Sequence, residues 1–183
     1  MHVDLTESQQ KIYIQLEKSI NSSFDRSKYV LTGDIGIGKT LIAKKIAESL
    51  NGRYICFTSE YGENFIKSID YASIEANDFL SYVQSEIIKD EEKDLILIDN
   101  IEFIFNKLFE KDKIEKFLKS YDRMPSKKKI VLVIPGYCIT YFNLNRKNLF
   151  SFEFKNSDKE KLAEIYKISK IESQDYTNGY YFK

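Results

Sequence analysis

The 183-residue sequence has no tryptophan, one histidine and two cysteines. The histidine is His2, so catalysis by histidine and a histidine-rich metal site are excluded. Cys56 and Cys138 are too few for a disulfide framework or a four-ligand zinc site, and we expect two reduced, buried thiols. No apolar run approaches the roughly 20 residues that span a bilayer. No signal-peptide pattern is visible either, so we expect a cytoplasmic protein without membrane contact.

An excess of either charge is also missing, because 28 basic residues balance 28 acidic ones. This balance excludes a surface that is basic throughout, as a general nucleic-acid binder would have. Any DNA contact is therefore expected to be local or made through partners. Lys127, Lys128 and Lys129 form the one basic cluster along the sequence, and we interpret them as the solvated start of a strand.

Short apolar runs alternate with segments of helical periodicity. Strands are expected at about residues 29–32, 54–58, 94–99, 129–134 and 150–154. Helices are expected at about 5–21, 39–50, 101–121 and 157–168, with 62–90 mostly helical. The 101–121 segment is either one helix or two helices with a break near residues 111–113. Thr6 and Gln9 can form a capping box at the first helix. The alternation predicts an α/β fold, a three-layer α/β/α arrangement around a mainly parallel five-stranded sheet.

We expect one domain over residues 1–183. It would comprise the N-terminal helix at about 5–21, a core at about 28–168 and a short tail at 169–183. The tail ends in several aromatic residues, which are candidates for a contact with a partner.

Glycine is scarce, yet three of the seven glycines fall between positions 33 and 38. The segment from Gly33 to Thr40 matches the phosphate-loop pattern G-x-x-x-x-G-K-[ST], or Walker A motif, between an expected strand and an expected helix. Its backbone amides would surround the phosphates of a nucleotide, and Lys39 would contact the β- and γ-phosphates. The residues expected to bind ATP are Gly33, Asp34, Ile35, Gly36, Ile37, Gly38, Lys39, Thr40 and Leu41.

A carboxylate follows the apolar strand at residues 95–98. Asp99 would reach the carboxyl edge of the sheet, where ligands bind in open α/β folds. In this interpretation Asp99 is a Walker B aspartate and, with the Thr40 hydroxyl, holds Mg²⁺. The alternative is that Asp99 merely caps the following helix.

Other classes of phosphate-loop protein fit less well. The Asp-x-x-Gly and Asn-Lys-x-Asp motifs of GTPases are missing, so adenine is the expected base by exclusion. A small-metabolite kinase usually needs several arginines to neutralise the transferred phosphate, and this chain has only Arg26, Arg53, Arg123 and Arg146. Arg123 and Arg146 are alternatively candidates for an arginine finger acting on a neighbouring molecule, or ordinary surface residues.

The remaining pattern resembles AAA+-like and RecA-like ATPases, which have an additional strand between the Walker A and Walker B strands. In AAA+-like members a glutamate follows the Walker B aspartate and polarises water, but here that position is Asn100. Glu60 and Glu102 are the candidate substitutes, and Glu60 suits the RecA-like position after the second strand better. The 129–134 strand ends without a polar sensor residue, and no lid domain is expected after about residue 156.

A more specific resemblance rests on the phrase Asp99-Asn100-Ile101-Glu102 and on Pro135-Gly136 after the later strand. These features, with the minimal phosphate-loop core, resemble the BrxF family of short P-loop proteins from type 3 BREX (bacteriophage exclusion) systems. The resemblance covers about residues 28–155. It implies an ATPase that acts with other subunits in bacterial defence against phage.

Two functions are compatible with these sequence features. The first is a slow ATPase with catalytic candidates Glu60, Glu102 and Lys39, completed by assembly as a homo-oligomer or with other defence-complex subunits. The second is a scaffold that binds ATP and Mg²⁺ and changes its oligomeric state or partners without appreciable hydrolysis, as Asn100 favours. A small-metabolite kinase ranks third.

Overall fold

Five parallel strands form one sheet in the order β2-β3-β4-β1-β5. The computed structural model describes residues 5–22, 27–69, 73–108, 111–138 and 149–153. The strands are β1 (Lys28–Gly33), β2 (Arg53–Cys56), β3 (Leu95–Asp99), β4 (Lys129–Pro135) and β5 (Leu149–Glu153). Since β4 lies between β1 and β3, the additional strand expected between the two Walker strands is present.

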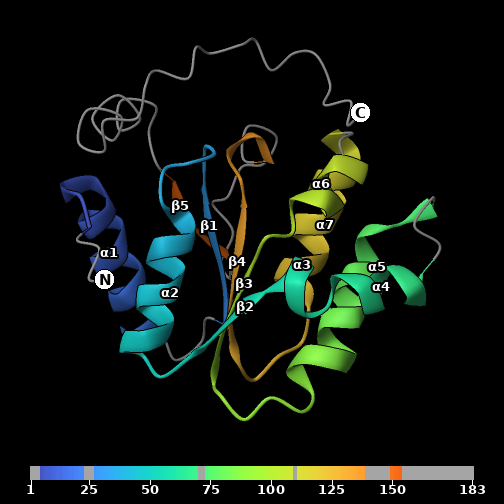
Figure 1. The fold of residues 1–183 in the computed structure, drawn as a ribbon, viewed down its shortest axis with the longest axis horizontal. Coiled ribbons are helices and arrows are strands. Elements are labelled where there is room, and N and C mark those ends of the chain that lie inside the picture. The colour runs from blue at the N-terminus through green and yellow to red at the C-terminus, as the bar shows by residue number, and fades with distance from the viewer. Residues whose placement is uncertain (1–4, 23–26, 70–72, 109–110, 139–148, 154–183) are drawn as a thin grey trace.

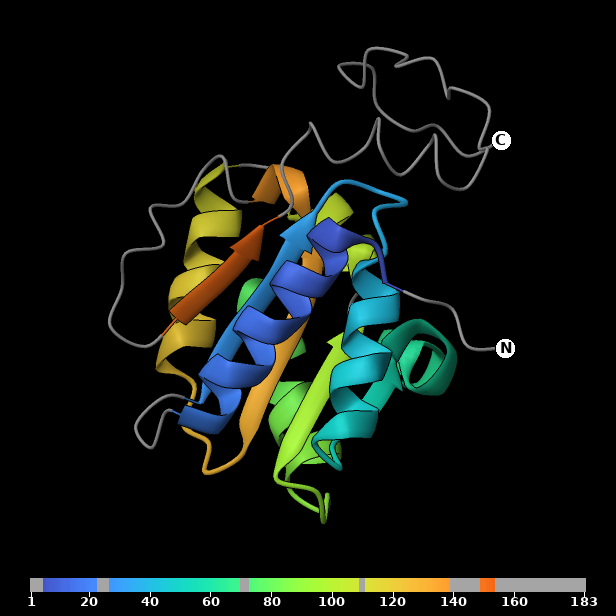
Figure 2. The ribbon, with the colours of Figure 1, turned by 90° about the vertical axis from the view of Figure 1, so that its left-hand side faces the viewer.

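Helices cover both faces of the sheet, so the expected three-layer fold is confirmed (Figures 1 and 2). One face carries α1 (Glu7–Ser22) and α2 (Lys39–Ser49). The elements on the other side are α3 (Phe57–Glu60), α4 (Gly62–Ser68), α5 (Ala76–Tyr82), the π-helix η2 (Val83–Ile88), α6 (Glu102–Lys107) and α7 (Lys111–Arg123). A 3₁₀ turn, η3 (Gly136–Cys138), follows β4. Among the described residues, no helix has the length and apolar character needed to cross a membrane.

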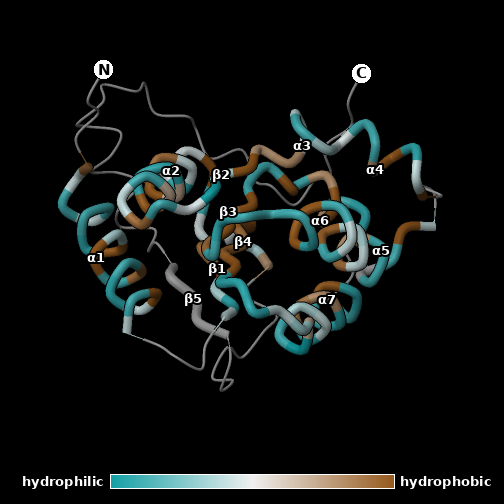
Figure 3. Tube along the Cα trace, turned by 90° about the horizontal axis from the view of Figure 1, so that it is seen from below, coloured by the Kyte–Doolittle hydropathy of each residue, from teal (hydrophilic) through white to brown (hydrophobic). Residues whose placement is uncertain are grey.

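The sheet separates two hydrophobic clusters, because successive side chains of a strand point to opposite faces. In β1, Tyr29 and Leu31 pack with α1 and α2, whereas Val30 packs with the helices of the other face. The cluster on the α1 and α2 side is mainly aliphatic. The cluster on the other face is rich in aromatic rings. It includes Phe57, whose ring centroid lies 5.0 Å from that of Phe79. Figure 3 shows the hydrophobic strands between the two helical layers.

The start of α1 has the predicted capping box. The Thr6 amide donates to Gln9 Oε1 at 3.0 Å, and the Gln9 amide donates to Thr6 Oγ1 at 3.3 Å. These two bonds satisfy backbone donors that the first helical turn would otherwise leave open. The described helix α1 therefore begins where the sequence predicts.

Two local predictions were wrong. The strand expected at 54–58 ends at Cys56, and the following residues form α3, because Ser59 Oγ donates to the Cys56 carbonyl and Glu60 Oε1 accepts from its amide. Cys56 also pairs with Asp99, the last residue of β3, so the ladder between β2 and β3 has no further partner.

The second wrong prediction concerns the burial of the two thiols. Cys138 is buried as expected, but Cys56 is only half-buried. The helix expected at 157–168 and the tail at 169–183 lie outside the described residues, and the division into one domain stays a prediction.

Candidate nucleotide-binding site

The loop between β1 and α2 has the backbone conformation of an anion cradle. Gly36 and Gly38 have φ values of 81° and 90°, in a region that residues with a Cβ rarely adopt. A Cβ built on Gly36 would meet no atom within 4 Å, so the loop is open above this residue. The loop leads directly into α2, whose first turn offers unpaired backbone amides to an anion. The residues present therefore fit a phosphate group.

Lys39, the first residue of α2, is 8% exposed. Its Nζ donates to the carbonyl oxygens of Gly33 at 2.8 Å and Asp34 at 2.9 Å, which hold the side chain over the loop. Burial lowers the pKa of Lys39, whereas the negative charges of Glu102, Asp99 and Asp34 oppose that shift. The ammonium group thus lies within a mainly desolvated site, where its attraction for phosphate is stronger than in water.

Thr40 and Asp99 come from different strand-to-helix connections and meet at one point. Thr40 Oγ1 donates to Asp99 Oδ2 at 2.6 Å, and the hydroxyl of Tyr54 donates to the same oxygen at 2.9 Å. Asp99 is 1% exposed, and its other oxygen accepts the Asn100 amide at 2.8 Å. Hydroxyl and carboxylate oxygens are the ligands that Mg²⁺ prefers.

This donor set is small. Among the described residues, no group of three or more histidine, cysteine, aspartate or glutamate side chains is placed to hold a metal ion. One carboxylate and one hydroxyl suffice for a Mg²⁺ ion that is also bound by nucleotide phosphates and water. The arrangement therefore fits a nucleotide-associated ion rather than a protein-enclosed metal centre.

The end of β4 lies directly against the phosphate loop. A Cβ on Gly136 would lie 2.9 Å from the carbonyl carbon of Gly33 and 3.3 Å from Asp34 Oδ1, so only glycine permits this approach. Thr32 Oγ1 donates to the Pro135 carbonyl at 3.2 Å and joins β1 to the same turn. Where AAA+-like ATPases place a polar sensor side chain, this protein thus has a close backbone contact.

Glu102 begins α6 near Lys39 and Asp99. Its side chain is partly buried, and this burial, with the negative charge of Asp99, raises the pKa of its carboxyl group. The positive charge of Lys39 acts in the opposite direction. The structure therefore brings Glu102 into electrostatic contact with residues of both nucleotide motifs.

Glu60 has different surroundings at the end of α3. Its Oε1 accepts the Cys56 amide at 2.8 Å, and its Oε2 accepts Arg53 Nη2 at 3.4 Å. Arg53 also donates to Glu91 at 2.6 Å. Both oxygens of Glu60 are thus bound by groups of β2, outside the phosphate loop.

Asn100 connects the ends of β3 and β2. It has a left-handed backbone with φ of 57°, and its Nδ2 lies 2.9 Å from Cys56 Sγ. Although burial opposes the shift, hydrogen bonds from Ser59 and Asn100 lower the pKa of the Cys56 thiol. The amide that replaces the usual glutamate is therefore directed towards β2.

Gln9 is a site residue that the sequence analysis missed. It is 2% exposed, and its Nε2 donates to the carbonyl of Ile37 in the phosphate loop at 3.0 Å. A Cβ on Gly38 would lie 2.3 Å from the same nitrogen, so Gln9 fills the space beside this glycine. The capping-box pattern identified Gln9 as a cap, but no local pattern reports a contact 28 residues away.

A family model for the ATPase family associated with various cellular activities (AAA) matches residues 29–155. The match begins in β1, includes both nucleotide motifs and ends just after β5.

The chain belongs to the AAA family.

Nucleotide binding of the ATPase type follows from this membership, in agreement with the P-loop fold of the AAA domain described above. No curated protein matches the chain.

Proposed function

We propose that the protein binds ATP with Mg²⁺ at the junction of β1, α2 and β3 and hydrolyses it slowly until partners complete the site. The observation that carries this proposal is the 2.6 Å hydrogen bond between Thr40 and Asp99. It joins the two motifs at the point where a phosphate-bound Mg²⁺ would need oxygen ligands. The buried ammonium of Lys39 beside the same point supports phosphate binding.

Each residue has a distinct task in this proposal. The loop from Gly33 to Gly38 binds the phosphates through its amides, and Leu41 extends these contacts into α2. Lys39 neutralises the β- and γ-phosphates, and Thr40 with Asp99 holds Mg²⁺. When bound, Mg²⁺ offsets the negative charge on the transferred phosphoryl group.

Glu102 is the base we propose for this reaction. Its carboxylate would accept a proton from the water that attacks the γ-phosphorus, while ADP leaves. Its placement beside Lys39 and Asp99 supports this role. Glu60, the other candidate, accepts hydrogen bonds from Cys56 and Arg53, and both of these contacts support a role at β2 rather than at the phosphate loop.

Slow hydrolysis is supported by the residues at two positions where AAA+-like ATPases have catalytic side chains, the position after the Walker B aspartate and the end of β4. Asn100 cannot act as a base, and its side chain is bound to Cys56. The turn at Pro135 and Gly136 supplies no polar sensor side chain. We therefore propose that a homo-oligomer or other subunits supply missing groups, and that the system is a BREX-type phage-defence complex, as the BrxF resemblance implies.

A nucleotide-dependent scaffold is the second candidate, because the same Asn100 contact favours binding over turnover. In that case ATP and Mg²⁺ change the oligomeric state or the choice of partner. A metabolite kinase receives less support, because Arg53 is already engaged by Glu91 and Glu60.

The binding part of the proposal is tested by titrating the protein with ATP and Mg²⁺ in a calorimeter. Lys39→Ala is expected to weaken ATP binding at least about 100-fold, because it removes a desolvated charge partner of the phosphates. Lys45→Ala, on the same helix, is the matched control and should bind like the wild type. Unchanged affinity in a folded Lys39→Ala protein would contradict the proposed site.

Turnover separates the two candidate functions. Phosphate release is measured over a wide range of protein concentration, together with mass by light scattering, with and without ATP and Mg²⁺. Specific activity that rises as oligomers form supports an ATPase with shared sites. Bound ATP without turnover at any concentration supports the scaffold.

A further inference from the structure

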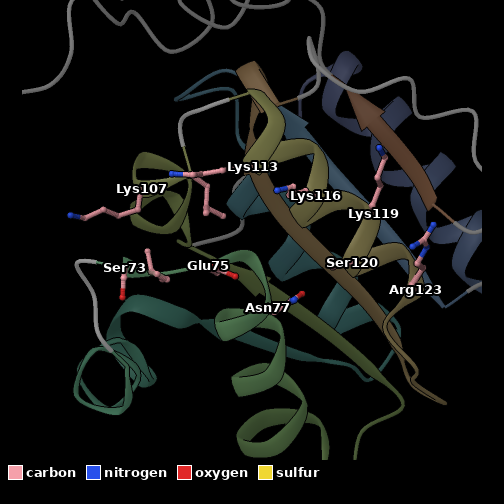
Figure 4. Close-up of a pocket in the computed structure, with 11 residues that line it drawn as sticks. Ser73, Glu75, Asn77, Lys107, Lys113, Lys116, Lys119, Ser120 and Arg123 are labelled. Atoms are coloured by element: carbon pink, nitrogen blue, oxygen red, sulfur yellow. The ribbon is translucent and has the colours of Figure 1, made fainter.

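A basic groove lies between α5 and the helices α6 and α7. Its volume is about 420 Å³. Lys107, at the end of α6, and four cations of α7 line one side, whereas Ser73, Glu75 and Asn77 line the other (Figure 4). The α7 cations are Lys113, Lys116, Lys119 and Arg123. We call this feature the α7 groove.

The cations of the α7 groove are held in a row by the fold. Lys113 and Arg123 are ten residues apart, which corresponds to about 15 Å along a helix. The opposite side of α7 is anchored in the core, since Ile114, Phe117 and Tyr121 are fully buried. Because the helix is packed, the backbone positions of these cations are set before any ligand arrives, and no backbone entropy of α7 is lost on binding.

The charge in the groove contrasts with that of the whole chain. Five cations face one lining carboxylate, Glu75, in a protein whose 28 basic and 28 acidic residues balance. Lys119 forms an ion pair with Glu115 on its own helix. Within the described part of the chain, Lys116 and Arg123 have no ion-pair partner. Such a local excess of positive charge attracts a polyanion.

The rest of the lining indicates which polyanion fits. Ser73, Asn77 and Ser120 add donors of the kind that contact phosphate oxygens. Among the described lining residues there is no aromatic ring on which a base could stack. Of the lining residues that the structure describes, the apolar ones are Ile74 and Leu108, which are 7% and 1% exposed and therefore do not supply the exposed anchors typical of a protein interface.

We propose that the α7 groove binds the phosphate backbone of a nucleic acid without reading its bases. The row extends about 15 Å, a length over which a duplex presents several phosphates. This site lies on the helical layer of α5 to α7, whereas α2, which follows the phosphate loop, covers the other face of the sheet (Figure 1). It is a function in addition to nucleotide binding and does not depend on it.

The test is binding of a fluorescent 20-base-pair DNA duplex by anisotropy, without ATP, between 50 and 200 mM salt. The logarithm of the affinity should fall with the logarithm of salt concentration, with a slope between about −3 and −4.5 for up to five phosphate contacts. The variant Lys116→Gln/Arg123→Gln should reduce this slope by about two and weaken binding at least about tenfold at low salt. Lys18→Gln/Lys89→Gln, which removes two exposed charges outside the groove, should keep the wild-type slope.

Two further measurements make the outcome decisive. The groove variant should bind ATP like the wild type, and Lys39→Ala should bind DNA like the wild type, so this site and the nucleotide site can fail separately. An unchanged salt slope in the folded groove variant would overturn the proposal, as would no DNA binding at 50 mM salt. Tighter binding of polyglutamate than of DNA would overturn it in favour of an acidic protein segment.

Discussion

The ends of β3 and β2 are neighbours in the sheet, yet their carboxylates have different surroundings. Cys56 and Asp99 pair across the two strands, and a glutamate follows each strand, Glu60 after β2 and Glu102 after β3. Glu102 lies partly buried in the field of Lys39 and Asp99. Glu60 is bound to the Cys56 amide and to Arg53. Position after a strand is therefore a weak guide to a catalytic base, because the hydrogen bonds of the side chain decide its direction.

One residue joins the two regions. Tyr54 belongs to β2, but its hydroxyl donates to Asp99 at the end of β3. Burial, followed by the charge of Asp99, raises the pKa of Tyr54, so the phenol stays protonated and continues to donate. The β2 end thus supports the site through Tyr54 rather than through Glu60.

The largest expected effect compares the two glutamates directly. Glu102→Gln should lower phosphate release at saturating ATP by about 100-fold or more, since general-base catalysis contributes at least that factor. Glu60→Gln should stay within about twofold of the wild type. Both variants should bind ATP normally in the calorimeter. A larger loss of turnover in Glu60→Gln than in Glu102→Gln would reverse the comparison.

The link between the regions is tested by Tyr54→Phe. Loss of the hydroxyl leaves Asp99 less well oriented, and the Mg²⁺ concentration for half-maximal ATP binding should rise about tenfold. Tyr13→Phe, which removes a hydroxyl that donates to Glu17 on α1, serves as the control. An unchanged Mg²⁺ requirement would mean that Asp99 is held by Thr40 and the backbone alone.

Gln9 connects α1 to the phosphate loop between β1 and α2, on the other side of the nucleotide site from β2. Gln9→Ala removes the hydrogen bond to the Ile37 carbonyl, and ATP should bind about fivefold more weakly, as expected for the loss of about 1 kcal/mol. Gln10→Ala, at an exposed neighbouring position, is the matched control. Should Gln9→Ala lower the thermal midpoint while ATP affinity stays unchanged, Gln9 would be only a helix cap.

The smallest expected effect concerns Lys28, a buried lysine at the amino end of β1, which is the opposite end of the strand from the phosphate loop. Burial lowers its pKa from 10.5 to about 8, against the attraction of Asp122. Between these values the unfolded chain binds more protons than the folded protein, so this group makes stability rise with pH. From pH 8 to 9.5 the wild type should gain about 1 kcal/mol relative to Lys28→Met, a few degrees in midpoint.

The Lys28 measurement uses thermal unfolding of both proteins at each pH. Because the difference is taken between two otherwise identical chains, titration of tyrosines and of Cys138 in the same pH range cancels. If the difference in thermal midpoint between the wild type and Lys28→Met does not change with pH, the Lys28 ammonium is solvated and the prediction is wrong.

Much of the site could be predicted because its signals are local. The spacing of Gly33, Lys39 and Thr40 is a backbone pattern, and Asp99 ends a buried strand, so both positions follow from neighbours in sequence. The single helical turn of α3 was missed because Ser59 and Glu60 form hydrogen bonds back to Cys56, which end the strand early. The choice between Glu60 and Glu102 also depended on Arg53, whose direction no pattern records.

The sequence by itself determined the order of strands and helices, the phosphate loop and the carboxylate that meets it, because these depend on periodicity and on the spacing of a few residue types. Only the tertiary structure decided what long-range contacts bring together. Gln9 reaches the phosphate loop, and five cations from α6 and α7 gather in one groove of a neutral chain. Along the sequence those cations alternate with acidic and apolar residues, and only helix geometry and packing place them side by side.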